Sequence, residues 1–123
     1  MLGNATIKAF VPTVKPGKAK IFYQDILGFK LLDEDNYALE FDAHGTLLRV
    51  IIVPELKAHP FTILGWDVGD IQEIILQLNA QGITCERYEF MEQDDLGIWI
   101  SPGGSKVAWF KDPDGNILSL TGQ

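Results

Sequence analysis

Two segments of the chain carry apolar residues at the i, i+3, i+4 and i+7 spacing of a helix that is buried along one side. The first segment contains Ala19, Phe22, Tyr23, Ile26 and Leu27, and the second contains Ile71, Ile74, Ile75 and Leu78. Gly28 and Gly82 follow them, where a left-handed C-terminal cap is expected. Asp70 and Glu73 suit the N-cap of the second helix and its third position.

Shorter apolar runs around the two helices predict strands. In the first half we expect strands at about 5–13, 29–34, 37–42 and 46–53. In the second half we expect them at about 61–68, 83–90, 105–111 and 116–121, with a further short strand over Ile98–Ile100. The sequence Asp112-Pro113-Asp114-Gly115 is a strong turn signal before the last strand.

The two halves repeat the same order of elements. An offset of 54 residues relates Gly28 to Gly82 and pairs Ala9 with Ile63. A second similarity relates the run 45–50 to the run 115–120. We therefore predict an α+β fold with two βαβββ modules, at about 5–53 and 61–121, in a single domain over 1–123. Each helix covers one sheet face, so the other face must meet a second sheet, a partner chain or a ligand.

Two motifs carry a family resemblance: the run from Ala19 through Phe22-Tyr23 to Leu27-Gly28-Phe29, and the run from Trp109 through Asp112-Pro113-Asp114-Gly115-Asn116 to Leu120. Together they resemble the vicinal oxygen chelate superfamily, the glyoxalase/bleomycin-resistance/dioxygenase group. The resemblance implies paired modules that form a U-shaped cleft for substrate and metal. It also implies a homodimer, because chains of this group with only two modules usually dimerise.

The resemblance places the metal ligands of that group at Ala9, Ile63 and Ser119, and Arg49 is the first-half equivalent of Ser119. Alanine and isoleucine have no donor atom, serine is a weak ligand, and an arginine repels a cation. A shift of one residue brings in Lys8, Thr62 or Leu118, which does not restore the site. We therefore expect no metal and no cofactor at these positions.

Composition narrows the possible partners and location. The formal net charge of −7 disfavours binding to a nucleic-acid backbone. No apolar run is long enough for a membrane span, and no secretory signal is recognisable at the N-terminus. Cys85 is the single cysteine, which fits a reducing compartment. We expect a cytoplasmic protein whose partner is a small-molecule ligand, with neither nucleic acid nor membrane.

The candidate ligand-binding residues are Arg49, Asp67, Trp99, Trp109 and Ser119. Strand parity places Trp66 on the helix side and Asp67 on the opposite side. Asp67 could bind a cationic or hydrogen-bonding ligand, or lie solvated at a strand end. Arg49 could anchor a carboxylate or phosphate, or form an ion pair between subunits. The tryptophans could line a cleft or fill a core or interface.

The leading hypothesis for function is a metal-independent protein that encloses a metabolite or antibiotic in a cleft. The alternative is a metal-dependent or metal-free enzyme of the same superfamily, a lyase, isomerase or dioxygenase, with Asp67, Glu40 or Glu89 as first candidates for acid–base work. A regulatory or interaction module is a third possibility. No nucleophile motif is visible, so catalytic residues remain unknown at this level.

Overall fold

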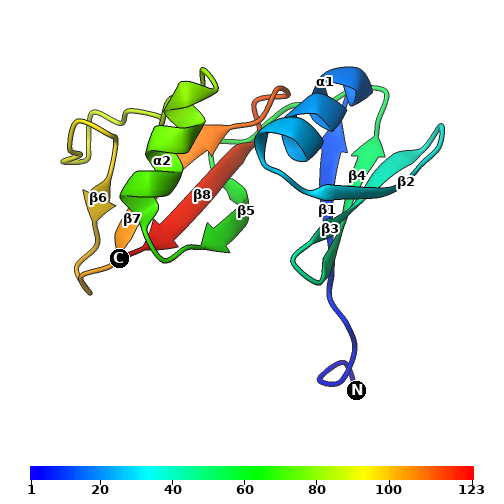
Figure 1. The fold of residues 1–123 in the computed structure, drawn as a ribbon, viewed down its shortest axis with the longest axis horizontal. Coiled ribbons are helices and arrows are strands. Elements are labelled where there is room, and N and C mark those ends of the chain that lie inside the picture. The colour runs from blue at the N-terminus through cyan, green and yellow to red at the C-terminus, as the bar shows by residue number, and fades with distance from the viewer. The chain divides into compact units, whose positions relative to one another are not determined.

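The computed structural model describes residues 1–123 and divides into two compact units, Met1–Lys57 and Ala58–Gln123. The boundary falls inside the linker between the two predicted modules. Each unit holds a four-stranded mixed sheet with helix on one face (Figure 1). The α+β fold class and the two-module architecture are thus confirmed. None of the helices combines the length and the hydropathy that a membrane-spanning helix needs.

The first unit consists of β1 (Lys8–Thr13), α1 (Pro16–Lys20), η1 (Ile21–Ile26), β2 (Lys30–Glu34), β3 (Ala38–Ala43) and β4 (Thr46–Ile52). Its strand order is β1-β4-β3-β2. Strand β1 runs parallel to β4, and the other pairs are antiparallel. A parallel pair needs a long crossover, and the helix with the two following strands supplies it.

The core of the first unit lies between its helix and one sheet face. Tyr23 is fully buried, with its ring centroid 5.0 Å from that of Phe22 and 6.0 Å from that of Phe41. Phe41 pairs with the buried Leu48, which pairs in turn with Ala9. Paired residues share a face, so all three lie on the helix side. The other face of this sheet carries Phe10, Glu40 and Arg49, which occupy paired positions on the adjacent strands.

The second unit consists of β5 (Thr62–Asp67), α2 (Ile71–Ala80), β6 (Trp99–Ile100), β7 (Lys106–Lys111) and β8 (Ile117–Gly122). Its order, β5-β8-β7-β6, repeats the order of the first unit. The predicted cap of α2 is confirmed, since the Asp70 side chain accepts a hydrogen bond of 3.2 Å from the Glu73 N–H. Gly28 and Gly82 both have φ of 83°, as expected of C-terminal caps.

Buried residues of α2 and of its sheet form the core of the second unit: Ile71, Ile75, Leu78, Ala108, Phe110, Leu118 and Leu120. Trp66 stacks on Phe110 with ring centroids 6.1 Å apart. Trp66 also pairs with Leu120, which is on the helix side. The parity prediction for Trp66 is therefore confirmed.

The predicted strand at 83–90 is wrong. Only the Glu86 N–H reaches the sheet, where it donates to the Trp109 carbonyl oxygen at 2.7 Å. The side chain of Gln93 occupies other backbone groups of the segment. It donates to the Glu86 and Gly97 carbonyl oxygens and accepts from the Tyr88 N–H. These groups are therefore bonded within the loop, and the short β6 pairs with β7 instead.

The first helix differs from the prediction of one regular helix. It begins as α1 and continues as the π-helical segment η1, in which the Leu27 N–H donates to the Phe22 carbonyl oxygen five residues earlier. A π-turn accommodates one extra residue. Between the N-cap and the capping glycine, the first unit has one residue more than the second, Lys15 to Gly28 against Asp70 to Gly82.

This extra residue changes the equivalence of the preceding strands. The offset is 54 at the glycines but 55 at the N-caps, Lys15 and Asp70. Strand register gives the same offset of 55 at one pair, because Arg49 pairs with Phe10 while its equivalent Ser119 pairs with Gly65. Farther back, a register shift in β5 between Thr62 and Leu64 leaves Ile63 without a paired residue in β8. Counted back from the N-caps Lys15 and Asp70, the counterpart of Ile63 is Lys8, not Ala9. Ala9 also lies on the helix side, so the metal-ligand position that the resemblance gave it is wrong.

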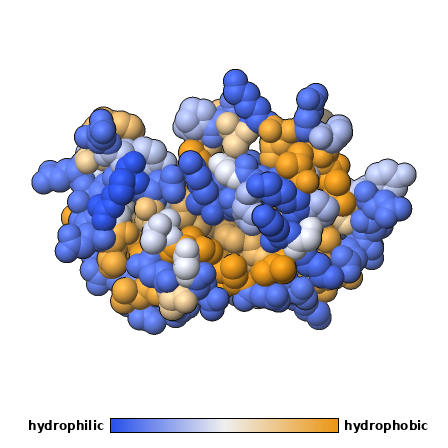
Figure 2. Space-filling model, turned by 90° about the horizontal axis from the view of Figure 1, so that it is seen from above, coloured by the Kyte–Doolittle hydropathy of each residue, from blue (hydrophilic) through white to orange (hydrophobic).

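Apolar side chains reach the surface at scattered positions. Tyr37, Phe61 and Phe90 are each more than half exposed. Orange hydrophobic patches interrupt the mainly hydrophilic face seen in Figure 2. Scattered exposure of this kind is normal for a globular chain and does not by itself mark a binding surface.

Candidate functional site

The face of the second sheet that lies opposite α2 collects four of the five candidate residues. Ser119 pairs with Gly65 on one side and with Trp109 on the other. In the next row on this face, Thr121 pairs with Asp67 and with Val107, and Val107 pairs with Trp99. Paired residues share a face. We call this surface the open face of the second sheet.

Aromatic side chains cover one part of the open face. The Trp109 ring centroid is 6.1 Å from that of Trp99 and 5.7 Å from that of Tyr88, which meets it edge-on. Tyr88 is 5.6 Å from Phe90. We call these four residues the aromatic cluster. Trp99, Trp109 and Tyr88 are half-buried, so part of each ring is available to a ligand.

Tyr88 was not among the predicted site residues, and the segment that carries it was expected to be a strand of the sheet. Burial raises the pKa of its phenol; the nearby Glu86 carboxylate also raises it, and Lys111 opposes them. The phenol is therefore neutral at physiological pH and contributes a hydrogen-bonding hydroxyl rather than a charge.

Polar side chains line a cavity beside the aromatic cluster. The cavity has a volume of about 510 Å³ and is bounded by Gly65, Trp66, Asp67, Ser105, Ser119, Thr121, Gly122 and Gln123. We call it the polar pocket. Its side chains offer three hydroxyl groups, one carboxylate and the amide of Gln123, and it has no lysine or arginine. Because its one charged side chain is an anion, the pocket favours ligands that donate hydrogen bonds or carry positive charge.

Gly65 shapes the floor of the polar pocket. A Cβ atom placed there would lie 2.6 Å from the Ser119 Oγ and 3.4 Å from the Ser119 carbonyl oxygen. The Ser119 hydroxyl therefore occupies the space that a side chain at position 65 would need. Gly65 was missed in the sequence, although a glycine inside a strand often marks a close approach by a ligand or another backbone.

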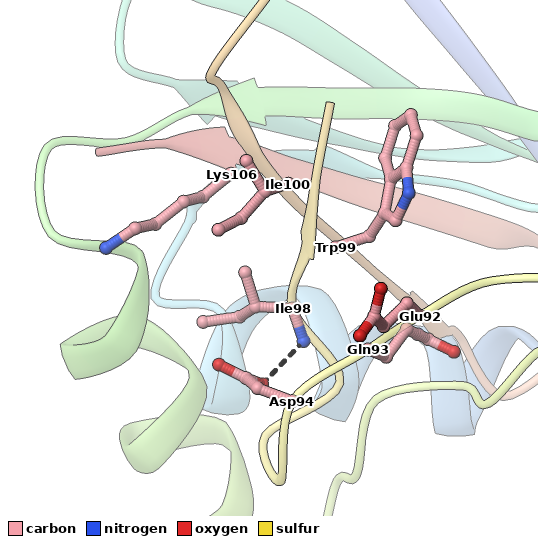
Figure 3. A pocket seen from close by; sticks show the side chains of 7 residues that line it. All are labelled: Glu92, Gln93, Asp94, Ile98, Trp99, Ile100 and Lys106. Carbon is pink, nitrogen blue, oxygen red and sulfur yellow. Dashed lines mark hydrogen bonds between the residues drawn. The ribbon is translucent and has the colours of Figure 1, made fainter. Parts of the chain in front are cut away.

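A second cavity of about 440 Å³ lies at the edge strand β6 and the preceding loop (Figure 3). Its lining residues are Glu92, Gln93, Asp94, Ile98, Trp99, Ile100 and Lys106. In Figure 3 the indole of Trp99 points away from the side chains of Ile98 and Ile100, in keeping with its place on the open face. Asp94 has a structural role here, because its Oδ1 accepts hydrogen bonds from the Leu96 and Ile98 N–H groups.

The fifth candidate, Arg49, belongs to the first unit. Its Nη1 lies 2.6 Å from the Glu40 Oε2 on the neighbouring strand, and both side chains are partly exposed. This ion pair is within one sheet, so Arg49 already has an anionic partner. The same contact occupies Glu40, one of the acids considered for catalysis.

Cys85 lies outside the open face and shows no sign of activation. Burial raises the pKa of its thiol to about 11, with the Arg87 guanidinium acting in the opposite direction. A reactive cysteine needs a lowered pKa. Cys85 therefore fits the packing role that is usual for an isolated cysteine.

Comparison with known proteins identifies the relationship. The model of the Glyoxalase/Bleomycin resistance protein/Dioxygenase superfamily matches residues 7–120. The chain belongs to this superfamily. No curated protein matches it.

Solved structures of this superfamily share the fold. Lactoylglutathione lyase from Agrobacterium tumefaciens is 15% identical with a TM-score of 0.76, and the alignment covers 99% of this chain and 96% of the other. A glyoxalase family protein from Enterococcus faecalis is 26% identical, with a TM-score of 0.70 and coverage of 98% and 99%. The fosfomycin resistance protein FosX from Listeria monocytogenes is 12% identical, with a TM-score of 0.75 and coverage of 98% and 93%.

The residues of this superfamily member do not fit the divalent metal that its family implies. With the first-strand position counted from the N-caps, the three ligand positions hold Lys8, Ile63 and Ser119. An ammonium group repels a cation, isoleucine has no donor atom, and a lone hydroxyl is a weak ligand. No group of three His, Cys, Asp or Glu side chains is placed to hold a metal ion.

The two histidines do not change this conclusion. His44 lies in the turn between β3 and β4 with φ of 52°. The His59 ring stacks on Phe61, with centroids 5.4 Å apart and planes 9° apart. The turn explains the position of His44, and the stacking contact with Phe61 explains that of His59.

Proposed function

We propose that this member of the superfamily binds a small organic ligand on the open face of the second sheet without a metal ion. The observation that carries the proposal is the juxtaposition of the aromatic cluster with the polar pocket on one sheet face. Sites for small molecules combine apolar walls with a few polar groups that fix orientation. Trp109 and Ser119, on paired positions of β7 and β8, join the two parts.

The aromatic cluster would supply most of the affinity. An aromatic contact is worth about 0.5–1.5 kcal/mol beyond the area that it buries. Trp99, Trp109 and Tyr88 together offer several such contacts to a flat ligand. The hydroxyl groups and Asp67 in the polar pocket would then select among flat ligands by their hydrogen-bonding groups.

Metal independence is supported by the residue types at the three ligand positions. Lys8, Ile63 and Ser119 together provide one cation, one hydrocarbon and one hydroxyl, so the family's metal-centred chemistry has no support from this set. Sequestration of a metabolite or an antibiotic is the form of the function that we favour. The homodimer and the cytoplasmic location expected from the sequence remain predictions, and the homodimer is tested by light scattering on the purified protein.

The proposal is tested by ligand titration of metal-stripped protein. Bleomycin and fosfomycin, which the names of the superfamily and of the Listeria protein suggest, lead a panel of antibiotics and metabolites. Binding is read from quenching of tryptophan fluorescence, and all three tryptophans lie in the second unit. We expect at least one ligand to bind in the presence of chelator and to lose at least tenfold in affinity in Trp109→Ala.

Tyr37→Ala is a matched control, because Tyr37 is an exposed aromatic residue of the first unit. Binding that appears only after a divalent metal is added would refute metal independence. Binding that Trp109→Ala and Trp99→Ala leave unchanged would refute the location. A panel with no ligand bound would count against the function itself.

A further inference from the structure

The backbone conformation in the middle of β5 does not require the glycine that is found there. Gly65 lies inside the strand Thr62–Asp67, and its φ is outside the left-handed region that glycine alone adopts readily. Glycine weakens a strand because it offers no side chain for packing and loses more chain entropy on folding. Its presence therefore calls for an explanation in the space around it.

The space above Gly65 is filled by the Ser119 hydroxyl. A Cβ atom at position 65 would lie 2.6 Å from the Ser119 Oγ, which is shorter than any ordinary van der Waals contact. A side chain here would displace the hydroxyl and would also project from the floor of the polar pocket. Glycine keeps the hydroxyl in place and the floor flat.

The charge of the polar pocket indicates which ligand group it suits. Asp67 is exposed, lines the pocket and takes no part in the ion pairs Lys20–Glu34, Arg49–Glu40 and Lys111–Glu86. The other polar side chains of the pocket include the hydroxyls of Ser105, Ser119 and Thr121. No basic side chain competes for the carboxylate inside the pocket. A planar cation with several N–H donors matches this set.

We propose that Gly65 is a specificity-determining residue, which lets a planar cationic group attached to an aromatic ring lie flat over β5. In that position the cation donates to the Asp67 carboxylate and the Ser119 hydroxyl, and the ring rests on Trp109. Trp109 pairs with Ser119, and Ser119 with Gly65, so the three follow one another across adjacent strands. This inference rests on the proposed function and names the ligand class of the same site.

The test uses three probes of one shape and different charge: benzamidine, benzamide and benzoate. Each is titrated into the full chain, and binding is followed by tryptophan fluorescence and by the backbone amide signals of Gly65 and Ser119 in NMR. We expect benzamidine to bind at least fivefold more tightly than benzamide, and benzoate to bind most weakly. Asp67→Asn should abolish the preference for benzamidine over benzamide.

Gly65→Ala should weaken benzamidine binding at least fivefold. Gly103→Ala is its matched control, because a Cβ atom at Gly103 would meet nothing within 4 Å. If Gly65→Ala does not fold, Gly65→Ala combined with Ser119→Ala removes the clash, and the double variant should still bind benzamidine more weakly than Ser119→Ala does.

The outcomes separate this inference from the proposed function. Equal affinity for the three probes would overturn the inference, and so would benzamidine binding that Gly65→Ala and Asp67→Asn leave unchanged. In either case, binding that depends on Trp109 would still support the proposed function. Probe binding that depends on Asp67 and is unaffected by Trp109→Ala would overturn the proposed location of the ring. If no probe binds, the inference fails, and the proposed function is then judged by its own panel.

Discussion

The contact between Gly65 and Ser119 predicts that the effect of Gly65→Ala on stability depends on the residue at position 119. In the wild-type chain, Gly65→Ala places a Cβ atom 2.6 Å from the Ser119 Oγ. In a Ser119→Ala background that oxygen is gone. The nearest atoms are then the backbone oxygen of residue 119 at 3.4 Å and its Cβ at 3.9 Å, which are ordinary contacts.

The magnitudes follow from these distances. Replacing a strand glycine by alanine stabilises by about 0.5–1 kcal/mol when the backbone conformation suits both residues. Turning the hydroxyl of the half-buried Ser119 away from the exposed Gly65 costs about 0.5–1.5 kcal/mol, the order of a strained or changed rotamer. We therefore expect Gly65→Ala to leave the stability of the wild-type chain nearly unchanged and to stabilise the Ser119→Ala chain by about 0.5–1 kcal/mol.

The assay is urea unfolding followed by tryptophan fluorescence. Trp66, Trp99 and Trp109 all lie in the second unit, so the signal reports on the unit that contains the substitution. Four proteins complete the cycle: the wild type, the two single variants and the double variant. The interaction free energy should be about 1 kcal/mol, above the roughly 0.3–0.5 kcal/mol within which independent substitutions add.

Equal effects of Gly65→Ala in the two backgrounds would refute the reasoning. They would show that the Ser119 hydroxyl is free to turn away from position 65. The glycine would then have no steric purpose, and the further inference would lose its structural basis. This test needs no ligand and is therefore independent of the probe titrations.

The remaining predictions concern other contacts of the two units. Because the pKa of the Cys85 thiol is raised from 9.0 to about 11, its alkylation by iodoacetamide at pH 8 should be about a hundredfold slower than in unfolded protein. An alkylation rate equal to that of unfolded protein would contradict the raised pKa. The stability that the neutral thiol contributes is full below pH 9 and is lost as the pH rises through 11. Gly97→Ala should destabilise the second unit by about 2 kcal/mol in urea unfolding and speed alkylation, because Gly97 has φ of 91° and its Cβ would lie 2.8 Å from the Cβ of Cys85. Asp112→Ala should cost about 2–3 kcal/mol by the same assay, since this buried carboxylate accepts three hydrogen bonds in the turn before β8, and a cost below 1 kcal/mol would refute that role. Glu40→Gln should change the melting temperature little, because its partly exposed ion pair with Arg49 is worth at most about 1 kcal/mol, whereas a large loss would show that the pair is essential to the first sheet.

Local patterns in the sequence predicted most of the fold correctly. The helical stripe at Ile71–Leu78, its Asp70 cap and the turn at Asp112–Gly115 depend on contacts within a few residues, and the structure shows all of them. Parity along β5 placed Trp66 on the helix side. Such features can be recognised in the sequence because side-chain direction repeats regularly along a helix or strand.

Two errors arose where the chain departs from that regularity. The π-turn in η1 inserts one residue into the first helix, which shifted the equivalence of Lys8 and Ala9. The segment 83–90 carries the apolar residues Ile83, Cys85, Tyr88 and Phe90, as a strand could, but the amide of Gln93 takes up its backbone groups. Neither an inserted helical residue nor a side chain that satisfies a distant backbone group produces a pattern in the sequence.

By itself, the sequence determined the two-module fold, because the order of elements repeats along the chain. It also determined the residue types at positions where the family resemblance places metal ligands: Ile63 has no donor atom, and Ser119 is a weak ligand. Only the tertiary structure decided which residues meet on the open face. Trp99, Trp109, Ser119 and Asp67 come from four different strands, and their proximity depends on strand register. The steric reason for a glycine at position 65 also came from the fold, since the atom that would meet a side chain there belongs to Ser119, far along the chain.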